Sequence, residues 1–257
     1  MKSLVMMVTF LTRIPLPQIG EFNEKDFVRG ILYAPIIGLL IGSVLAIESY
    51  LLRPYLPSIV LGFLIFLTYL VITGGLHIDG LVDSADGLYS SRKKEKILEI
   101  MKDSRVGTFG ALALLIVCIG FIIGAGYLGW QGILFVPLVG RITLLQTAAS
   151  GKYARSEGGM GKGIVDYVDM KHWMYWVLIF GAIALVGAIL IDKILFAIIF
   201  LSYIQLIGIM HFKLRDIIKK IDGITGDIMG YSVEISQVLY MMILIIWMGV
   251  FGWSLYL

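Results

Sequence analysis

Long apolar runs constrain this chain more than any other feature of its sequence. We count seven runs that approach or exceed the roughly 20 apolar residues a membrane-spanning helix needs. They lie near residues 31–52, 57–77, 109–129, 132–150, 173–191, 194–212 and 235–256. Hydrophobic residues make up 59% of the chain and charged residues 15%, whereas soluble domains average about half and about a quarter. The sequence therefore predicts an all-α, polytopic membrane protein of about seven transmembrane helices, forming a single domain over residues 1–257.

The N-terminal 16 residues form a separate segment. Its apolar stretch is too short to span a bilayer, so it either lies at the membrane interface or re-enters the membrane. Arg13 precedes two prolines, in Arg13-Ile14-Pro15-Leu16-Pro17. The sequence leaves two roles open for this cation, an interfacial anchor or a contact with a phosphate.

The distribution of lysine and arginine predicts the orientation. These residues gather in the N-terminal segment and in three long polar connections, predicted over 78–108, 151–172 and 213–234, whereas the short connections hold only Arg53 and Lys193. Loops rich in lysine and arginine stay in the cytoplasm. We therefore expect the N-terminus and all three long loops to be cytoplasmic and the C-terminus to lie outside the cell membrane. The active site is then expected on the cytoplasmic face.

One polar block, residues 74–88, follows directly on an apolar run. It contains His77 and three aspartates, Asp79, Asp83 and Asp86, at spacings of four and three residues. On a helix this spacing places the three carboxylates on one face. Like charges that close raise each other's pKa unless a cation lies between them, and hard divalent ions such as Mg²⁺ prefer such oxygen ligands. The alternative is structural, because an aspartate such as Asp83 or Asp86 can cap a following helix.

Further charged residues surround this block in the sequence. Lys102, Asp103 and Arg105 precede the third apolar run, and Asp103 with Arg105 either binds metal and phosphate or forms an ion pair. Arg141 lies well inside the fourth run, where a charge is costly unless it is paired or functional. Arg155 begins a glycine-rich stretch, 155–163, that is typical of phosphate-binding loops.

A second acidic pair lies further along the chain. Asp227 is surrounded by glycines, and Glu234 follows it by two helical turns. The pair either completes a metal site with the first block or belongs to a glycine-rich turn followed by a helix cap.

This inventory favours phosphoryl transfer assisted by a divalent metal. A cation- or proton-coupled transporter is the competing interpretation, but transporter carboxylates usually lie in mid-span, whereas these lie at span ends and in loops. The net charge of +3 gives no indication of nucleic-acid binding.

The blocks Gly74–Leu88, Lys102–Gly110, Tyr153–Gly161 and Gly223–Gly230, with Leu11–Pro17, resemble the cobalamin synthase family (adenosylcobinamide-GDP ribazoletransferase) over nearly the whole chain. One departure is Asp222, where the family more often has glycine. The motif Asp83-Ser84-Ala85-Asp86-Gly87 also resembles the opening of the CDP-alcohol phosphotransferase motif, but the Ala-Arg that should follow is absent. A CDP-alcohol phosphotransferase is therefore the alternative enzyme.

The first resemblance implies a membrane enzyme that joins adenosylcobinamide-GDP to α-ribazole, or to its 5′-phosphate, and releases GMP with the help of Mg²⁺. It implies catalytic roles for five residues: His77, Asp79, Asp83, Asp86 and Asp103. It implies phosphate binding by arginines and a lysine, and metal binding by five carboxylates. The phosphate-binding candidates are Arg13, Lys102, Arg105, Arg141 and Arg155. The metal-binding candidates are Asp79, Asp83, Asp86, Asp227 and Glu234. Homo-oligomer formation stays open.

Overall fold

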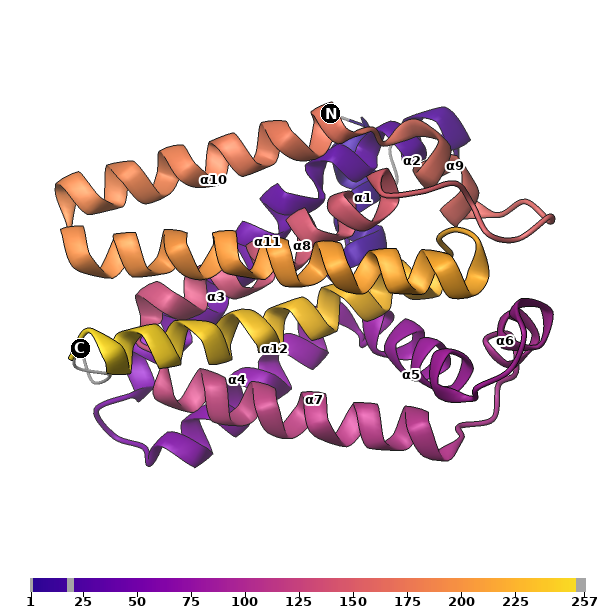
Figure 1. The fold of residues 1–257 in the computed structure, drawn as a ribbon. Helices are drawn as coiled ribbons and strands as arrows, with labels where there is room; N and C mark the ends of the chain where they lie inside the picture. The colour runs from indigo at the N-terminus through magenta and orange to yellow at the C-terminus, as the bar shows by residue number, and fades with distance from the viewer. Residues whose placement is uncertain (1, 18–20, 253–257) are drawn as a thin grey trace.

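The computed structural model describes residues 2–17 and 21–252, which are almost entirely helical (Figure 1). The helices are α1 (Lys2–Leu11), α2 (Glu24–Gly30), η1 (Ile31–Tyr33), α3 (Ala34–Leu52), α4 (Ser58–Thr73), α5 (Leu76–Tyr89), α6 (Lys94–Ile100), α7 (Thr108–Tyr127), α8 (Trp130–Ala149), α9 (Met160–Tyr167), α10 (Met170–Leu190), α11 (Lys193–Ile221) and α12 (Gly226–Val250).

The helices confirm the predicted class of polytopic helical membrane protein. Six helical stretches among the described residues are long and apolar enough to cross a membrane: Glu24–Leu52, α7, α8, α10, α11 and α12. A seventh crossing would combine α4 with α5, which meet at a bend of 97°. All seven predicted runs fall on these helices. Residues 253–256, the end of the last predicted run, lie outside the described residues.

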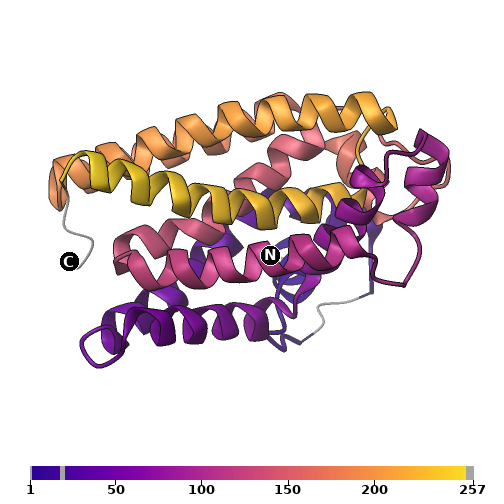
Figure 2. The same ribbon diagram turned by 60° about the horizontal axis from the view of Figure 1, so that its bottom comes forward.

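The centre of the bundle is α8, which is buried along nearly its whole length. It packs against α3 on one side and α12 on another, and α7 packs against α4, α5 and α12. The short helices α5, α6 and α9 lie together at one end of the bundle, beside the connection from α11 to α12 (Figures 1 and 2). The end of α12 and the α10–α11 connection lie at the opposite end. The polar motifs are therefore gathered at one end of the molecule.

The break between α4 and α5 depends on two glycines. Gly74 and Gly75 have φ angles of 63° and 68°, in the left-handed region that L-residues with a Cβ rarely adopt. The backbone N–H of Arg13 donates to the carbonyl of Ile72 at 2.7 Å, and the Arg13 side chain lies against Gly74, where a Cβ would collide with it. The N-terminal segment thus fixes the turn after which α5 leaves the direction of the span.

The position of α5 depends on its contact with α12. A Cβ on Gly80 would lie 2.8 Å from the carbonyl oxygen of Asp227, and one on Gly230 would lie 3.0 Å from the carbonyl oxygen of His77. Real Cβ atoms do not approach backbone atoms that closely without some displacement. The two glycines therefore allow α5 and α12 to cross in direct backbone contact, which brings the aspartates of α5 next to the first turn of α12.

The long polar loop predicted over 213–234 is wrong. The helix α11 continues to Ile221 and α12 begins at Gly226, so only four residues connect them. Beyond the apolar run, α11 keeps a buried stripe made of Leu214, Ile217 and Ile221, which packs inward while polar residues cover its other side. The α11 C-cap, Asp222, has a left-handed φ of 56°, a conformation that glycine adopts most easily.

The other two long connections are also partly helical. The first contains α5 and then α6. The second contains α9. The N-terminal apolar segment forms α1, which packs on α2 and α3 and buries Met7 and Leu11.

Candidate active site

The three aspartates of the first polar block lie on the helix α5, as their spacing predicts. Asp79 is exposed, whereas Asp83 and Asp86 are half-buried. Asp227, in the first turn of α12, faces them across the Gly80 contact. We call Asp79, Asp83, Asp86 and Asp227 the acidic face.

The electrostatics of the acidic face centre on Asp83. Burial, together with the negative charges of Asp79, Asp227 and Asp86, raises the pKa of the Asp83 carboxyl to about 6 against the opposing effect of Arg155. Three like charges around one carboxylate make an unfavourable arrangement unless a cation is bound there. The repulsion indicates a site for positive charge.

Asp227 has a cation as its partner. Arg155 Nη2 donates to Asp227 Oδ2 at 2.6 Å, and the Thr225 hydroxyl lies 3.3 Å from the same oxygen. Arg155 is held there by backbone pairing between two loops, since Ala154 N–H donates to the Ile224 carbonyl at 2.9 Å and Ile224 N–H donates to the Lys152 carbonyl at 2.8 Å. The glycine-rich loop therefore delivers one arginine to the acidic face.

Asp86 acts as a helix cap. Its two carboxylate oxygens accept hydrogen bonds from the backbone N–H groups of Gly107 and Gly110, at 2.7 Å and 2.8 Å. These N–H groups lie at the N-terminus of α7 and have no partner within that helix. Asp86 therefore acts as the helix cap that the sequence left open as an alternative. The helix it caps is α7, however, and not α6, which is the next helix in the chain.

The acidic face has the donor chemistry of a divalent metal site. Its side chains offer carboxylate oxygens, which Mg²⁺ and Ca²⁺ prefer, and their mutual repulsion would be relieved by such an ion. As the side chains are placed, no three His, Cys, Asp or Glu residues in the described ranges are close enough to hold a metal ion. Asp86 and Asp227 are engaged by α7 and by Arg155 instead.

A cavity of about 250 Å³ adjoins the acidic face. Its polar lining comes from His77, Asp79 and Asp227, and the rest of its wall is mostly apolar. The apolar side chains come from α1, η1, α5, α8, α9 and α12: Phe10, Leu11, Ile31, Leu76, Leu144, Met160, Ile164 and Met229. The cavity therefore offers an apolar chamber with two carboxylates at one side.

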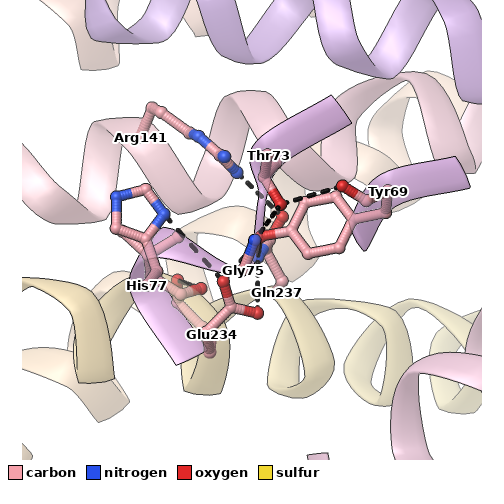
Figure 3. Close-up of polar contacts among 9 residues, drawn as sticks. Tyr69, Thr73, Gly75, His77, Arg141, Glu234 and Gln237 are labelled. Carbon is pink, nitrogen blue, oxygen red and sulfur yellow. Dashed lines mark hydrogen bonds and ion pairs between the residues drawn. The ribbon is translucent and has the colours of Figure 1, made fainter. Parts of the chain in front are cut away.

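A second polar group lies inside the bundle (Figure 3). It consists of Tyr69, His77, Arg141, Glu234 and Gln237, all of which are buried, and we call it the buried polar cluster. The Tyr69 hydroxyl donates to Glu234 Oε1 at 2.6 Å, and Gln237 Nε2 lies 2.9 Å from the Tyr69 hydroxyl and 3.4 Å from Glu234 Oε2. Glu234, predicted as a metal ligand together with Asp227, is thus engaged inside the bundle.

Arg141 is the cation of this cluster. Its side chain is fully buried, Nη1 donates to Gln237 Oε1 at 3.2 Å, and the guanidinium lies 5.7 Å from the centre of the Tyr69 ring. Its Nε and Nη2 atoms have no hydrogen-bond partner among the described residues. His77 Nδ1 lies 3.9 Å from Glu234 Oε1. The cluster joins α4, α5, α8 and α12, and His77 connects it to the cavity.

The remaining predicted residues lie in loops around the acidic face. Asp103 and Arg105 pair with each other through several hydrogen bonds, the shortest at 2.6 Å, which fits the ion-pair alternative. Lys102 pairs with Glu157 at 2.7 Å. Both pairs are solvent-exposed, and exposed pairs of this kind contribute little to stability.

Sequence reasoning missed Tyr69 and Gln237. A signal for Gln237 was available, since it follows Glu234 by three residues inside an apolar run and therefore lies on the same helix face. Tyr69 gave no such signal, because tyrosine is common in apolar helices.

Comparisons with known proteins show which family matches this chain. A family model described as cobalamin-5-phosphate synthase matches residues 3–245. A protein from Alkaliphilus oremlandii, named adenosylcobinamide-GDP ribazoletransferase, is 40% identical over 94% of this chain and 96% of its own length. Proteins with the same name from Acetivibrio thermocellus and Clostridium acetobutylicum are each 35% identical, over 95% and 94% of this chain and 97% and 94% of their own lengths. No solved structure matches the chain.

Proposed function

The chain belongs to the cobalamin-5-phosphate synthase family, and on this premise we propose that it is a Mg²⁺-dependent adenosylcobinamide-GDP ribazoletransferase. It transfers the cobinamide-phosphate group of adenosylcobinamide-GDP to the ribose 3′-hydroxyl of α-ribazole or of α-ribazole 5′-phosphate. The observation that carries this proposal is the acidic face, where carboxylates from α5 and α12 meet Arg155 beside a cavity. Phosphoryl transfer needs this combination of acidic oxygens and cations.

In the reaction, the 3′-oxygen of the acceptor forms a bond to the phosphorus nearest the cobinamide. The bond from that phosphorus to the bridging oxygen breaks, and GMP leaves with that oxygen. Asp79 lines the cavity and is exposed. We therefore propose that its carboxylate accepts the proton of the attacking hydroxyl.

Asp83 and Asp227 would hold the Mg²⁺, with Asp79 alongside. When bound, the ion neutralises phosphate charge on the reacting group and on the leaving GMP. Arg155, which pairs with Asp227 at 2.6 Å in the structure, would then be free to contact the pyrophosphate in a bidentate manner. Asp86 and Glu234 keep their structural contacts with α7 and Tyr69 in this assignment.

The cavity is assigned to the acceptor. The base of a ribazole is flat and largely apolar, and the wall formed by α1, α8 and α9 is also apolar. Burial of the base would place the ribose near Asp79 and Asp227, the polar lining residues. This arrangement would bring the 3′-hydroxyl and the metal site together.

We further propose that the polar end of the bundle, with the N-terminal segment, faces the cytoplasm and that the C-terminus lies outside the cell membrane. Lysine and arginine concentrate in the segments at the polar end, whereas Arg53 and Lys193 alone lie in the connections at the opposite end. A cytoplasmic site gives nucleotide substrates and GMP direct access to solution. Cysteine introduced at Ser156 in a Cys118→Ala background should react with an impermeant maleimide only after cells are permeabilised; reaction in intact cells would reverse the orientation.

GMP release tests the proposed reaction. Detergent-purified protein should release GMP from adenosylcobinamide-GDP only when both α-ribazole phosphate and Mg²⁺ are present. Release without the acceptor would indicate hydrolysis, and release without a divalent ion would remove Mg²⁺ from the proposal. If correctly folded protein released no GMP under any of these conditions, CDP-alcohol substrates would be tested next.

A further inference from the structure

A second cavity lies at the other end of α5, away from the chamber assigned to the acceptor. It has a volume of about 310 Å³ and is formed by the end of α5 and the last turns of α11. Its lining consists of Leu88, Tyr89, Lys213, Asp216, Ile217, Lys219 and Lys220. The two cavities share no lining residue. Three lysines against one aspartate give this cavity a positive charge.

Two of these lysines are held in place by aromatic rings and a backbone carbonyl. Lys213 Nζ donates to the Tyr89 hydroxyl at 2.9 Å and lies 5.3 Å and 5.8 Å from the ring centres of Tyr89 and Tyr231. Lys220 Nζ donates to the Leu88 carbonyl at 3.1 Å and lies 5.8 Å from the Tyr89 ring centre. The contacts restrain two flexible side chains, which lowers the entropic cost of binding a ligand.

Neither Lys213 nor Lys220 has a carboxylate within ion-pair distance among the residues that the structure describes. Other lysines on the same end of the bundle do. Lys94 and Lys152 both pair with Asp222, at 3.3 Å and 3.0 Å, and Lys102 pairs with Glu157. The single aspartate of the cavity, Asp216, lies 3.8 Å from Lys219. Two positioned ammonium groups are therefore left without a counter-charge.

The phenol of Tyr89 responds to this charge. Burial raises the pKa of Tyr89, but hydrogen bonds from Lys213 and Tyr231 and the charges of Lys213 and Lys220 outweigh burial and leave the pKa below its usual value. An anion bound between the two lysines would experience the same attraction.

The cavity lies at the level expected for lipid head groups. The helix α11 has 29 residues, so at about 1.5 Å per residue it is about 44 Å long, longer than the hydrocarbon core of about 30 Å. Its last turns, which begin near Lys213, therefore project beyond the apolar layer. There they can meet either the phosphate of a membrane lipid or that of a nucleotide from solution.

We propose that Lys213 and Lys220 form a binding site for a phosphate-bearing anion, either an anionic lipid head group or a free nucleotide. Lysine binds phosphate as a compact point charge, and lysines near an anionic membrane surface are attracted to its head groups. The site is separate from the acidic face and does not depend on the proposed reaction.

Thermal unfolding in detergent micelles tests this site. Purified protein would be mixed with phosphatidylglycerol, with phosphatidylcholine, or with GMP, and compared with a Lys213→Gln/Lys220→Gln variant. The matched control is Arg215→Gln, which removes a charge from the same turns of α11 but does not line the cavity. We expect phosphatidylglycerol or GMP to raise the Tm of the parent and of the control by about 2–4 °C. The double variant should lose this response.

A response to phosphatidylglycerol alone would identify a lipid site, and a response to GMP alone a nucleotide site. The proposal would be overturned if the double variant responded to both probes as strongly as Arg215→Gln does. It would also be overturned if the parent responded to neither probe. If the double variant does not fold, the single variant Lys220→Gln answers the same question. GMP release measured in parallel separates failure of this site from failure of the proposed reaction.

Discussion

The acidic face and the buried polar cluster are two polar regions formed by the same pair of helices, α5 and α12. In the buried polar cluster, Glu234 accepts hydrogen bonds from Tyr69 and Gln237, and Arg141 lies over an aromatic ring. Within residues 2–17 and 21–252, no like charge raises the pKa of Glu234. In the acidic face, burial and the like charges that surround Asp83 raise its pKa to about 6. One region has its carboxylate satisfied inside the protein, and the other has carboxylates that repel each other beside a cavity.

Under the proposed function, this difference separates structural from functional polar groups. Ionisable residues at membrane depth are often functional. Arg141 lies well inside the fourth apolar run, and Glu234 directly precedes the seventh. In the structure, Glu234 accepts hydrogen bonds from Tyr69 and Gln237, and Arg141 donates one to Gln237, within a cluster that joins four helices. The unfavourable charges lie on α5, at the polar end. We therefore base the proposed ligand site on unsatisfied repulsion and not on depth in the membrane.

The substitution Asp83→Asn should produce the largest effect of all. It removes a carboxylate at the centre of the acidic face, so we expect GMP release to fall by about 100-fold or more. The Tm should stay unchanged or rise, because the substitution also removes repulsion from Asp79 and Asp227. GMP release and thermal unfolding would be measured beside Asp166→Asn, an exposed aspartate of α9. Full activity in Asp83→Asn would move the metal site away from α5.

The substitution Arg141→Met tests the opposite region. It removes the Arg141 hydrogen bond to Gln237 Oε1 and the cation near Glu234. We therefore expect a loss of roughly 1–3 kcal/mol in the free energy of unfolding. Adding Glu234→Gln should recover part of that loss, since the uncompensated charge is then removed. Unfolding would be followed in detergent, and GMP release per folded molecule should stay within about 3-fold. A large loss of activity with unchanged stability would return Arg141 to the phosphate-binding role that the sequence suggested.

The crossing of α5 and α12, the helices that form both regions, can be tested at Gly80. A Cβ there would lie 2.8 Å from the Asp227 carbonyl oxygen and 3.0 Å from its Cα, so Gly80→Ala must shift α5 relative to α12. Small displacements of catalytic groups are costly, and we expect about 10-fold less GMP release and a lower Tm. The control is Gly208→Ala on α11, where a Cβ meets nothing within 4 Å. Equal activity of both variants would show that the crossing tolerates more space than its backbone contact indicates.

Local features of this chain could be predicted from the sequence, and contacts between distant segments could not. Apolar runs located the spans, and spacing placed Asp79, Asp83 and Asp86 on a helix. The end of α11 was missed because the apolar run stops near residue 212, although Leu214, Ile217 and Ile221 continue a helical stripe. Gly107, which donates to Asp86, lies 21 residues away in the sequence, and Arg155, which pairs with Asp227, lies 72 residues away. Such pairings depend on the packing of the bundle, and no local pattern specifies them.

The exposed pair of Asp103 and Arg105 should show the smallest effect. Hydrogen bonds from the Arg105 side chain and backbone lower the pKa of the Asp103 carboxyl to about 2. A carboxyl with a lowered pKa stabilises the fold above its usual pKa of about 3.9, and that contribution is lost as the pH falls through about 2. Between about pH 5 and pH 8, Asp103 therefore adds no pH dependence to stability.

We accordingly expect Asp103→Asn to change GMP release by less than about 3-fold and to leave the Tm near its parent value at neutral pH, because solvent and salt screen an exposed pair. Activity and Tm would be measured at low and high salt beside Lys102→Gln, which removes the neighbouring exposed pair with Glu157. A loss approaching that of Asp83→Asn, at unchanged Tm, would mean that Asp103 leaves Arg105 when substrate binds. The acidic face would then extend from α5 into the loop before α7, and charge repulsion in the free protein would not mark its full extent.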